Sequence, residues 1–228
     1  MMTNDLPGDP TLDEIRDALA PRLAANAAFD GWNMEAIDAA AFEIGVDTDV
    51  ARLAFKADGI SRNPAMNMID AWIASVDDEM ERRLPAETLA GMKIRARITA
   101  LIETRLDITA PDIEGQRRAA AIMAQPQNLA RTAKIGWRAA DKMWRLAGDT
   151  ATDFNHYTKR MTLSAVYSST LAVFLQDESE DYAETKAFLG RRIENVMQFE
   201  KAKAQAKARR ENIPSLSRFI GRLRYPAR

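Results

Sequence analysis

Hydrophobic residues recur along this chain at three- and four-residue spacing, which places them on one face of an α-helix. The first such segment begins after Thr11, the second follows Asn33, and the third runs from about Thr48 to Phe55. No Asn-Gly or Asp-Gly turn joins two alternating, strand-like segments. The pattern therefore predicts an all-α protein.

Longer helical patterns occupy the rest of the chain. Their expected ranges are about 64–83, from Pro85 past Ile102 as one helix, 111–125, 127–147, about 153–176, and from about 179 into the basic residues 201–210. The helix at 127–147 has the clearest apolar stripe, and Gly148 follows it at the position of a C-cap glycine. The next helix is apolar on most faces between Met161 and Leu175. That pattern indicates a helix buried in a bundle or in a dimer interface, and we expect a homodimer that uses the long C-terminal helices.

The composition excludes several classes of chemistry. The chain has 228 residues, no cysteine and one histidine, His156. Disulfides, iron–sulfur clusters and thiol nucleophiles are therefore excluded, and one histidine cannot supply the paired histidines of a di-iron or catalytic zinc centre. The ten glycines are too far apart for a glycine-rich phosphate loop. We expect no catalytic residues, no metal and no cofactor other than a bound ligand, so the chain is predicted not to be an enzyme.

Charge is distributed unevenly. Residues 1–60 hold 4 basic and 12 acidic side chains, whereas residues 201–228 hold 9 basic and 1 acidic, so the two ends carry −8 and +8. The N-terminus lacks the apolar stretch of a signal peptide. The longest uncharged run, Met161–Gln176, is too short and too polar for a membrane span. These features predict a cytoplasmic location and different partners for the two ends.

The first three helices have the proportions of a helix-turn-helix. The spacing from Ala41 through Gly45-Val46-Asp47 to Phe55 resembles the DNA-binding end of TetR-like regulators. This part is either a DNA-binding unit or a three-helix cap kept for packing. Because residues 1–60 carry −8, and DNA binding requires basic residues that neutralise phosphates, we favour the packing role and expect no nucleic-acid partner.

The C-terminal residues form a basic amphipathic pattern. Apolar side chains recur at helical spacing and arginines lie at or beyond the apolar edge, which is typical of a helix that lies on an anionic membrane surface. The predicted membrane-binding residues are Ile213, Leu216, Arg218, Phe219, Ile220, Arg222 and Leu223. The alternative is a helix that docks on the bundle or on a second subunit. We divide the chain into a helix-turn-helix-like part (1–60), a ligand-binding and dimerisation bundle (61–210) and this amphipathic helix (211–228).

Residues 137–195 contain a long and unusual string, Ala147-Gly148-Asp149-Thr150-Ala151-Thr152-Asp153-Phe154-Asn155-His156-Tyr157-Thr158-Lys159-Arg160. The string resembles the lipid-binding accessory proteins of ubiquinone biosynthesis, the ninth Coq protein family, whose fold is TetR-like. One departure is His156, where the family often has tryptophan. The resemblance implies a non-enzymatic protein, peripherally attached to the inner membrane, that binds a polyprenyl quinone precursor and presents it to the di-iron hydroxylase of the pathway. A ligand-responsive regulator of the same fold is the alternative.

Two sets of site residues follow. The inward stripes of the two helices joined at Gly148 predict an isoprenoid lipid pocket, with ordinary core packing as the alternative, lined by Trp137, Met143, Trp144, Phe154, Tyr167, Leu171 and Phe174. The densest part of the family string predicts the hydroxylase-binding residues Asp153, Asn155, His156, Tyr157, Lys159 and Arg160. His156 could also be a metal ligand or a general base, but no second histidine completes such a site.

Overall fold

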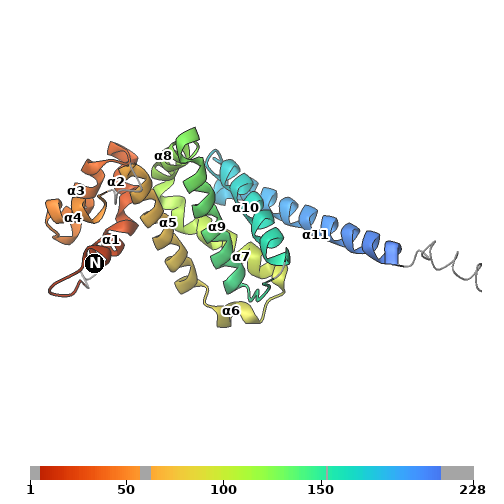
Figure 1. The fold of residues 1–228 in the computed structure, drawn as a ribbon. Helices are drawn as coiled ribbons and strands as arrows, with labels where there is room; N and C mark the ends of the chain where they lie inside the picture. The colour runs from red at the N-terminus through yellow and green to blue at the C-terminus, as the bar shows by residue number, and fades with distance from the viewer. Residues whose placement is uncertain (1–5, 57–62, 153, 212–228) are drawn as a thin grey trace, which may run out of the picture.

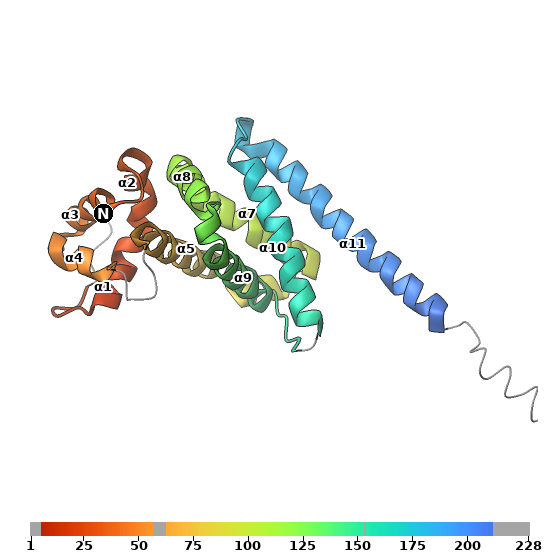
Figure 2. The same cartoon turned by 45° about the horizontal axis from the view of Figure 1, so that its top comes forward.

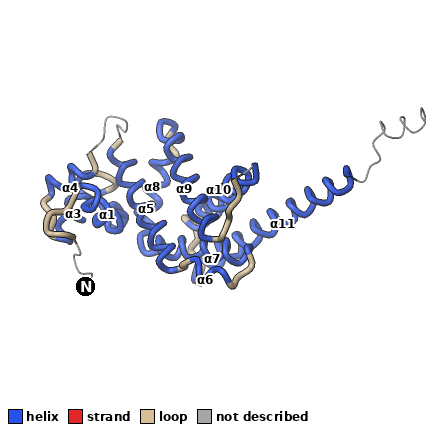
Figure 3. The backbone as a smooth tube through the Cα atoms, turned by 60° about the horizontal axis from the view of Figure 1, so that its bottom comes forward, coloured by secondary structure: helices blue, strands red, loops and turns tan. Residues whose placement is uncertain are grey.

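The structure, a computed structural model, describes residues 6–56, 63–152 and 154–211. Over these ranges the chain forms α-helices and short 3-10 turns with no strand, so the prediction of an all-α protein is confirmed (Figure 3). The α-helices are α1 (Leu12–Leu19), α2 (Leu23–Asp30), α3 (Met34–Ile44), α4 (Thr48–Ala54), α5 (Pro64–Arg83), α6 (Ala86–Ala90), α7 (Ile94–Thr109), α8 (Ile113–Met123), α9 (Leu129–Leu146), α10 (Phe154–Phe174) and α11 (Ala183–Glu211).

The helices are arranged in sequence along an elongated molecule. Helices α1–α4 cluster at one end, α5 and α7–α10 form the central bundle, and α11 projects from the opposite end (Figure 1). One hydrophobic core joins α1–α4 to the first half of α5, including Met68 and Trp72. A second core joins Met80, at the end of α5, to α7, α9, α10 and α11. Helix α5 therefore belongs to both cores and links the two ends of the molecule.

Local sequence signals explain the N-terminal helices. Thr11 begins α1 with a capping box in which its hydroxyl and the Glu14 carboxylate each accept a backbone N–H. Gly45 ends α3 with φ +70°, a backbone conformation that favours glycine, and Asp47 caps α4. The expected helix–turn–helix arrangement of α3 and α4 is therefore present.

A close helix contact joins this cluster to the bundle. A Cβ atom on Gly115 of α8 would lie 2.1 Å from the Ala24 carbonyl oxygen of α2, so only glycine allows the two helices to approach this closely. The Trp32 indole N–H also donates to the Gly115 carbonyl at 2.9 Å. Helix α2 and Trp32 thus pack the N-terminal cluster closely against α8.

The segment after Pro85 differs from the prediction, because two helices replace one. Helix α6 ends at Gly91, and α7 begins at Ile94. The Arg97 guanidinium donates to the carbonyls of Ala90 and Met92, at 2.8 Å each, and to that of Ala147 at 2.7 Å. These bonds satisfy the backbone groups exposed by the break and tie it to the end of α9.

Helix α11 has 29 residues and is therefore about 44 Å long. Its first half packs on α7 and α10, and the second half extends beyond the bundle (Figure 2). The Asp177 carboxylate holds the start of α11, accepting bonds from the N–H groups of Ser179 and Thr185 at 2.8 Å each. Burial alone would raise the pKa of Asp177, but these bonds lower it below its ordinary value. In the part of the chain that the structure describes, we find no helix with the length and apolarity needed to cross a bilayer.

Candidate functional site

The turn between α9 and α10 is held by ion pairs from the unusual string. Gly148 ends α9 with φ +89°, and the Asp149 N–H then donates to the Trp144 carbonyl at 2.9 Å, as in a Schellman motif. The buried Asp149 carboxylate accepts bonds from Lys159 at 2.6 Å and Arg160 at 3.1 Å. Burial would raise the pKa of Asp149, but these two cations lower it. In the unusual string, Gly148-Asp149 and Lys159-Arg160 therefore form one structural unit.

Arg160 is the centre of this unit. Its side chain is 2% exposed, and its guanidinium also bonds to Asp141 of α9 at 2.6 Å and to the His156 carbonyl at 3.1 Å. Arg160 thus joins α9, the turn and the first two turns of α10. The first turns of α10 carry the cavity wall and the aromatic side chains described next. Arg160 fixes the position of these turns from their buried side.

A cavity of about 220 Å³ lies beside α10, between it, α7 and α11. Most of its wall is apolar, but one stripe on the first turns of α10 is polar. The cavity, partly open to solvent, is lined by Ile94, Arg95, Ile98, Trp144, Asn155, Thr158, Lys159, Thr162, Leu163, Val166, Ile193, Val196 and Met197. We call it the lateral cavity.

The two basic residues of the lateral cavity are paired with carboxylates. Lys159 bonds to Asp149, and its ammonium lies 5.3 Å from the Trp144 ring centroid. Arg95 of α7 pairs with Glu194 of α11 at 2.6 Å. The cavity therefore offers hydrogen-bond donors at one side and apolar surface elsewhere, with little unpaired charge.

An aromatic surface lies on another face of α10. We give this name to Trp137, His156 and Tyr157, whose ring centroids are 5.2 to 6.2 Å apart. Tyr157 is 57% exposed, and His156 is oriented by a 3.0 Å contact between its Nδ1 and the Ala151 carbonyl. Phe154 and Met161 are also exposed on this side of α10. The surface resembles the apolar centre of a protein interface.

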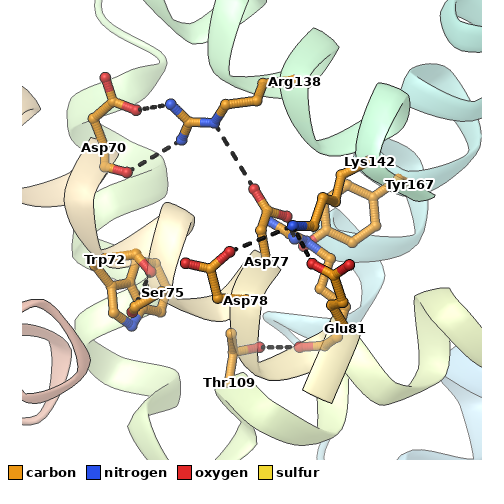
Figure 4. Close-up of polar contacts among 12 residues, drawn as sticks. Asp70, Trp72, Ser75, Asp77, Asp78, Glu81, Thr109, Arg138, Lys142 and Tyr167 are labelled. Carbon is orange, nitrogen blue, oxygen red and sulfur yellow. Dashed lines mark hydrogen bonds and ion pairs between the residues drawn. The ribbon is translucent and has the colours of Figure 1, made fainter. Parts of the chain in front are cut away.

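A polar network lies in the central bundle and joins side chains of α5, α7, α9 and α10 (Figure 4). Arg105 of α7 pairs with Asp77 of α5 and bonds to the Tyr167 hydroxyl at 2.9 Å. Arg138 pairs with Asp70 at 2.6 Å and reaches toward Asp77. Burial alone would lower the pKa of Arg105, but Tyr167 and Asp77 raise it, so the guanidinium stays charged. The sequence analysis did not predict this network. The signal that could have indicated it is a charged residue at a buried helical position on each of two helices, Asp77 on α5 and Arg105 on α7.

The predicted lipid-pocket residues are distributed over several environments. Trp144 borders the lateral cavity, whereas Met143 and Phe174 are buried in the second core. Tyr167 and Leu171 pack against that core, and Tyr167 also holds Arg105. Trp137 belongs to the aromatic surface and Phe154 is exposed. The structure thus brings one of the seven to the cavity, and the lipid-binding role of all seven stays a prediction.

The predicted hydroxylase-binding residues separate into three groups. Asn155 and Lys159 border the lateral cavity, and His156 and Tyr157 form the aromatic surface. Arg160 is buried, so its guanidinium positions its neighbours rather than facing solvent. Asp153 and all seven predicted membrane-binding residues lie outside the described residues.

Comparison with known proteins identifies the C-terminal helices. The sequence model of the COQ9 family matches residues 129–200, which contain α9, α10 and most of α11. Residues 129–200, called the COQ9 domain below, are therefore similar to that family. The COQ9 domain supplies all lining residues of the lateral cavity except Ile94, Arg95 and Ile98. The family resemblance predicted from the string at 147–160 is confirmed.

Individual COQ9 relatives extend the similarity beyond that domain. The chain is 32% identical to the mitochondrial ubiquinone biosynthesis protein COQ9 of Rattus norvegicus over 179 residues, and 30% identical to that of Homo sapiens over 178 residues. Each match covers 78% of this chain but 57% and 56% of the relatives, so the chain spans a little over half their length.

The fold has a solved counterpart. A TetR transcriptional regulator from Nitrosomonas europaea superposes with a TM-score of 0.62 at 22% identity, covering 82% of this chain and 99% of the regulator. The prediction of a TetR-like fold is therefore confirmed. At this identity the likeness concerns the fold alone.

Proposed function

We propose that this chain acts in ubiquinone biosynthesis as a non-catalytic protein that binds an isoprenoid lipid and presents it to the di-iron hydroxylase of the pathway. The observation that carries the proposal is the lateral cavity, because ten of its thirteen lining residues belong to the COQ9 domain. The names of the COQ9 relatives support the pathway.

The walls of the lateral cavity suit a lipid with a polar ring and an apolar tail. Asn155, Thr158 and Thr162 offer hydrogen bonds along one stripe of α10, whereas Ile193 and Met197 of α11 offer apolar contacts. Because Met197 has a flexible thioether side chain, it adapts to tails of different shape. The polar ring would therefore lie toward the start of α10, near the aromatic surface.

Filling the cavity tests the lipid-binding role. Thr162→Trp places an indole in the lateral cavity, and Ala165→Trp places the same group on an exposed position of α10 outside it. Native mass spectrometry with lipid extraction should find a co-purified isoprenoid lipid in the wild type and in Ala165→Trp, and none in Thr162→Trp. Retention of the lipid by both variants would exclude the lateral cavity as its site.

The aromatic surface is the proposed docking site for the hydroxylase. Exposed aromatic side chains are typical anchors of protein interfaces, and this surface adjoins the polar end of the cavity. Tyr157→Ala and His156→Ala should reduce pull-down of the hydroxylase at least tenfold. Phe29→Ala, at a more exposed aromatic residue on α2, should leave pull-down unchanged. Equal pull-down by all three variants would place the docking site elsewhere.

Attachment to the membrane surface is assigned to residues 213–225. Helix α11 carries the chain away from the bundle, so a following amphipathic segment could meet a bilayer while the bundle stays in water. Five large apolar side chains and several arginines supply reversible binding to anionic lipid. Deletion of residues 211–228 should abolish co-flotation with anionic liposomes and leave the cavity lipid bound. Unchanged flotation would favour docking of the segment on protein.

A further inference from the structure

The outer face of α3 and α4 combines exposed apolar side chains with acidic residues. Phe42 of α3 is 86% exposed, and Leu53 of α4 is 50% exposed. Residues 34–56 contain five carboxylates and two basic side chains. Exposed apolar side chains bordered by charged ones are typical of an interaction surface. We call it the α3–α4 face.

The α3–α4 face lacks the positive charge with which a DNA-binding helix-turn-helix attracts nucleic acid. Arg52, the one arginine of α4, pairs through its guanidinium with Asp38 and lies 3.8 Å from Asp49. The Asp47 carboxylate occupies the start of α4, where a phosphate contact would need positive charge. The field of this face is therefore negative, and its occupant must be basic as well as apolar.

The chain itself contains a segment of that chemistry. Residues 212–228 carry four arginines and no carboxylate, together with apolar side chains at helical spacing. Residues 201–228 hold nine basic side chains against one acidic, opposite in sign to residues 1–60. We infer that the α3–α4 face binds residues 212–228 of a second copy of this chain.

The geometry assigns the contact to a second copy. Helix α11 leads away from α3 and α4, and the central bundle separates them (Figures 1 and 2). A 17-residue segment is about 26 Å long as a helix, little more than the projecting half of α11 that it would have to retrace. The segment of a neighbouring molecule has no such constraint.

The contact also regulates membrane attachment, a step that rests on the proposed function. The arginines and apolar residues that meet the α3–α4 face are the ones that would meet anionic lipid. Protein and bilayer therefore compete for one segment, and anionic lipid should release it. The protein contact itself does not depend on lipid and is measured in its absence.

A labelled synthetic peptide of residues 212–228, titrated into the full chain, tests the inference by fluorescence anisotropy. Binding should be saturable and at least tenfold weaker at 300 mM than at 50 mM NaCl, because exposed charges are screened. Phe42→Ser and Asp49→Asn should each weaken it at least fivefold. Phe29→Ser, at an exposed phenylalanine on α2 rather than on α3 or α4, should change it less than twofold.

Other outcomes would overturn the inference. If Phe42→Ser and Phe29→Ser weaken binding equally, or if a scrambled peptide binds as tightly, the attraction is a general one to an acidic protein. If Met161→Ser on α10 reduces binding instead, the peptide occupies a different apolar surface. Vesicles containing phosphatidylglycerol should displace the peptide from the wild-type chain, whereas phosphatidylcholine vesicles should not. Failure of the vesicle arm alone would remove the regulatory step.

Discussion

Replacing Arg160 with methionine should destabilise the protein strongly, although the substitution leaves no large cavity in the core. Methionine keeps most of the side-chain length and removes the charge. The Asp149 carboxylate, 5% exposed, then keeps Lys159 as its one cationic partner, and Asp141 keeps Arg145. The His156 carbonyl also loses a charged donor.

The magnitude follows from burial. Removing one partner of a buried ion pair costs about 3–5 kcal/mol, because the other charge is left without compensation. Lys159 and Arg145 compensate in part, so we expect a loss near the lower end, about 3 kcal/mol. In a protein of this size, about 1 kcal/mol lowers the Tm by about 2–4 °C, and the expected fall is therefore about 6–12 °C.

Urea denaturation followed by circular dichroism at pH 7 measures the loss. Arg145→Met is the matched control, since Arg145 also bonds to Asp141, at 2.7 Å, but its side chain is 71% exposed. An exposed ion pair contributes about 0–1 kcal/mol, so this variant should remain close to wild type. If Arg160→Met costs less than about 1 kcal/mol, or no more than the control, the ion pairs do not hold the α9–α10 turn.

Three further outcomes follow from the same structure. Asp77→Asn should lower the free energy of unfolding by about 3–5 kcal/mol in urea titrations, whereas Asp77→Leu combined with Arg105→Met should cost less, because no buried charge is left alone. The pKa values of Asp149 and Asp177 lie below the ordinary 3.8, so these carboxylates take up protons at higher pH in the unfolded chain than in the folded one. The stability that they contribute is therefore complete above about pH 5, and it is lost as the pH falls through their folded-state pKa values. Asp177→Asn should therefore flatten that acid limb, and an unchanged limb would contradict the assignment. Sedimentation at micromolar concentration should show a homodimer, and Met161→Glu on the exposed face of α10 should weaken it; a 25.4 kDa monomer in the wild type would contradict the dimer.

Helix boundaries were predictable where the signal is local. Asn33 caps α3 through its own side chain, Pro64 begins α5, and Gly148 ends the α9 region with positive φ. The break between α6 and α7 was not predictable, because its carbonyls are satisfied by Arg97, which also reaches Ala147, 50 residues away along the chain. Apolar periodicity continues through Gly91 and conceals the break.

The site was predictable in composition but not in orientation. The string at 147–160 marked the correct turn, yet Arg160 points inward because α9 and the turn place Asp141 and Asp149 beneath it. Sequence periodicity assigns an arginine to the solvent side of a helix. The lateral cavity also lies on a different side of α10 from the inward apolar stripe where the lipid pocket was expected. Helices α7 and α11 form its other walls, and no local sequence signal determines where they pack.

The first turns of α10 place three roles on three faces of one helix. Arg160 lies on the buried face, Asn155 and Lys159 border the lateral cavity, and Tyr157 lies on the aromatic surface. Successive faces of a helix are separated by about 100° per residue, so a partner docked on Tyr157 would lie within one helical diameter of a polar group bound at Asn155. A carrier and an enzyme need this proximity if the lipid is to pass between them without entering water. Because Lys159 and Arg160 share Asp149, the ion pairs that hold the turn also orient the cavity wall, and the density of charged residues in the string follows from that shared support.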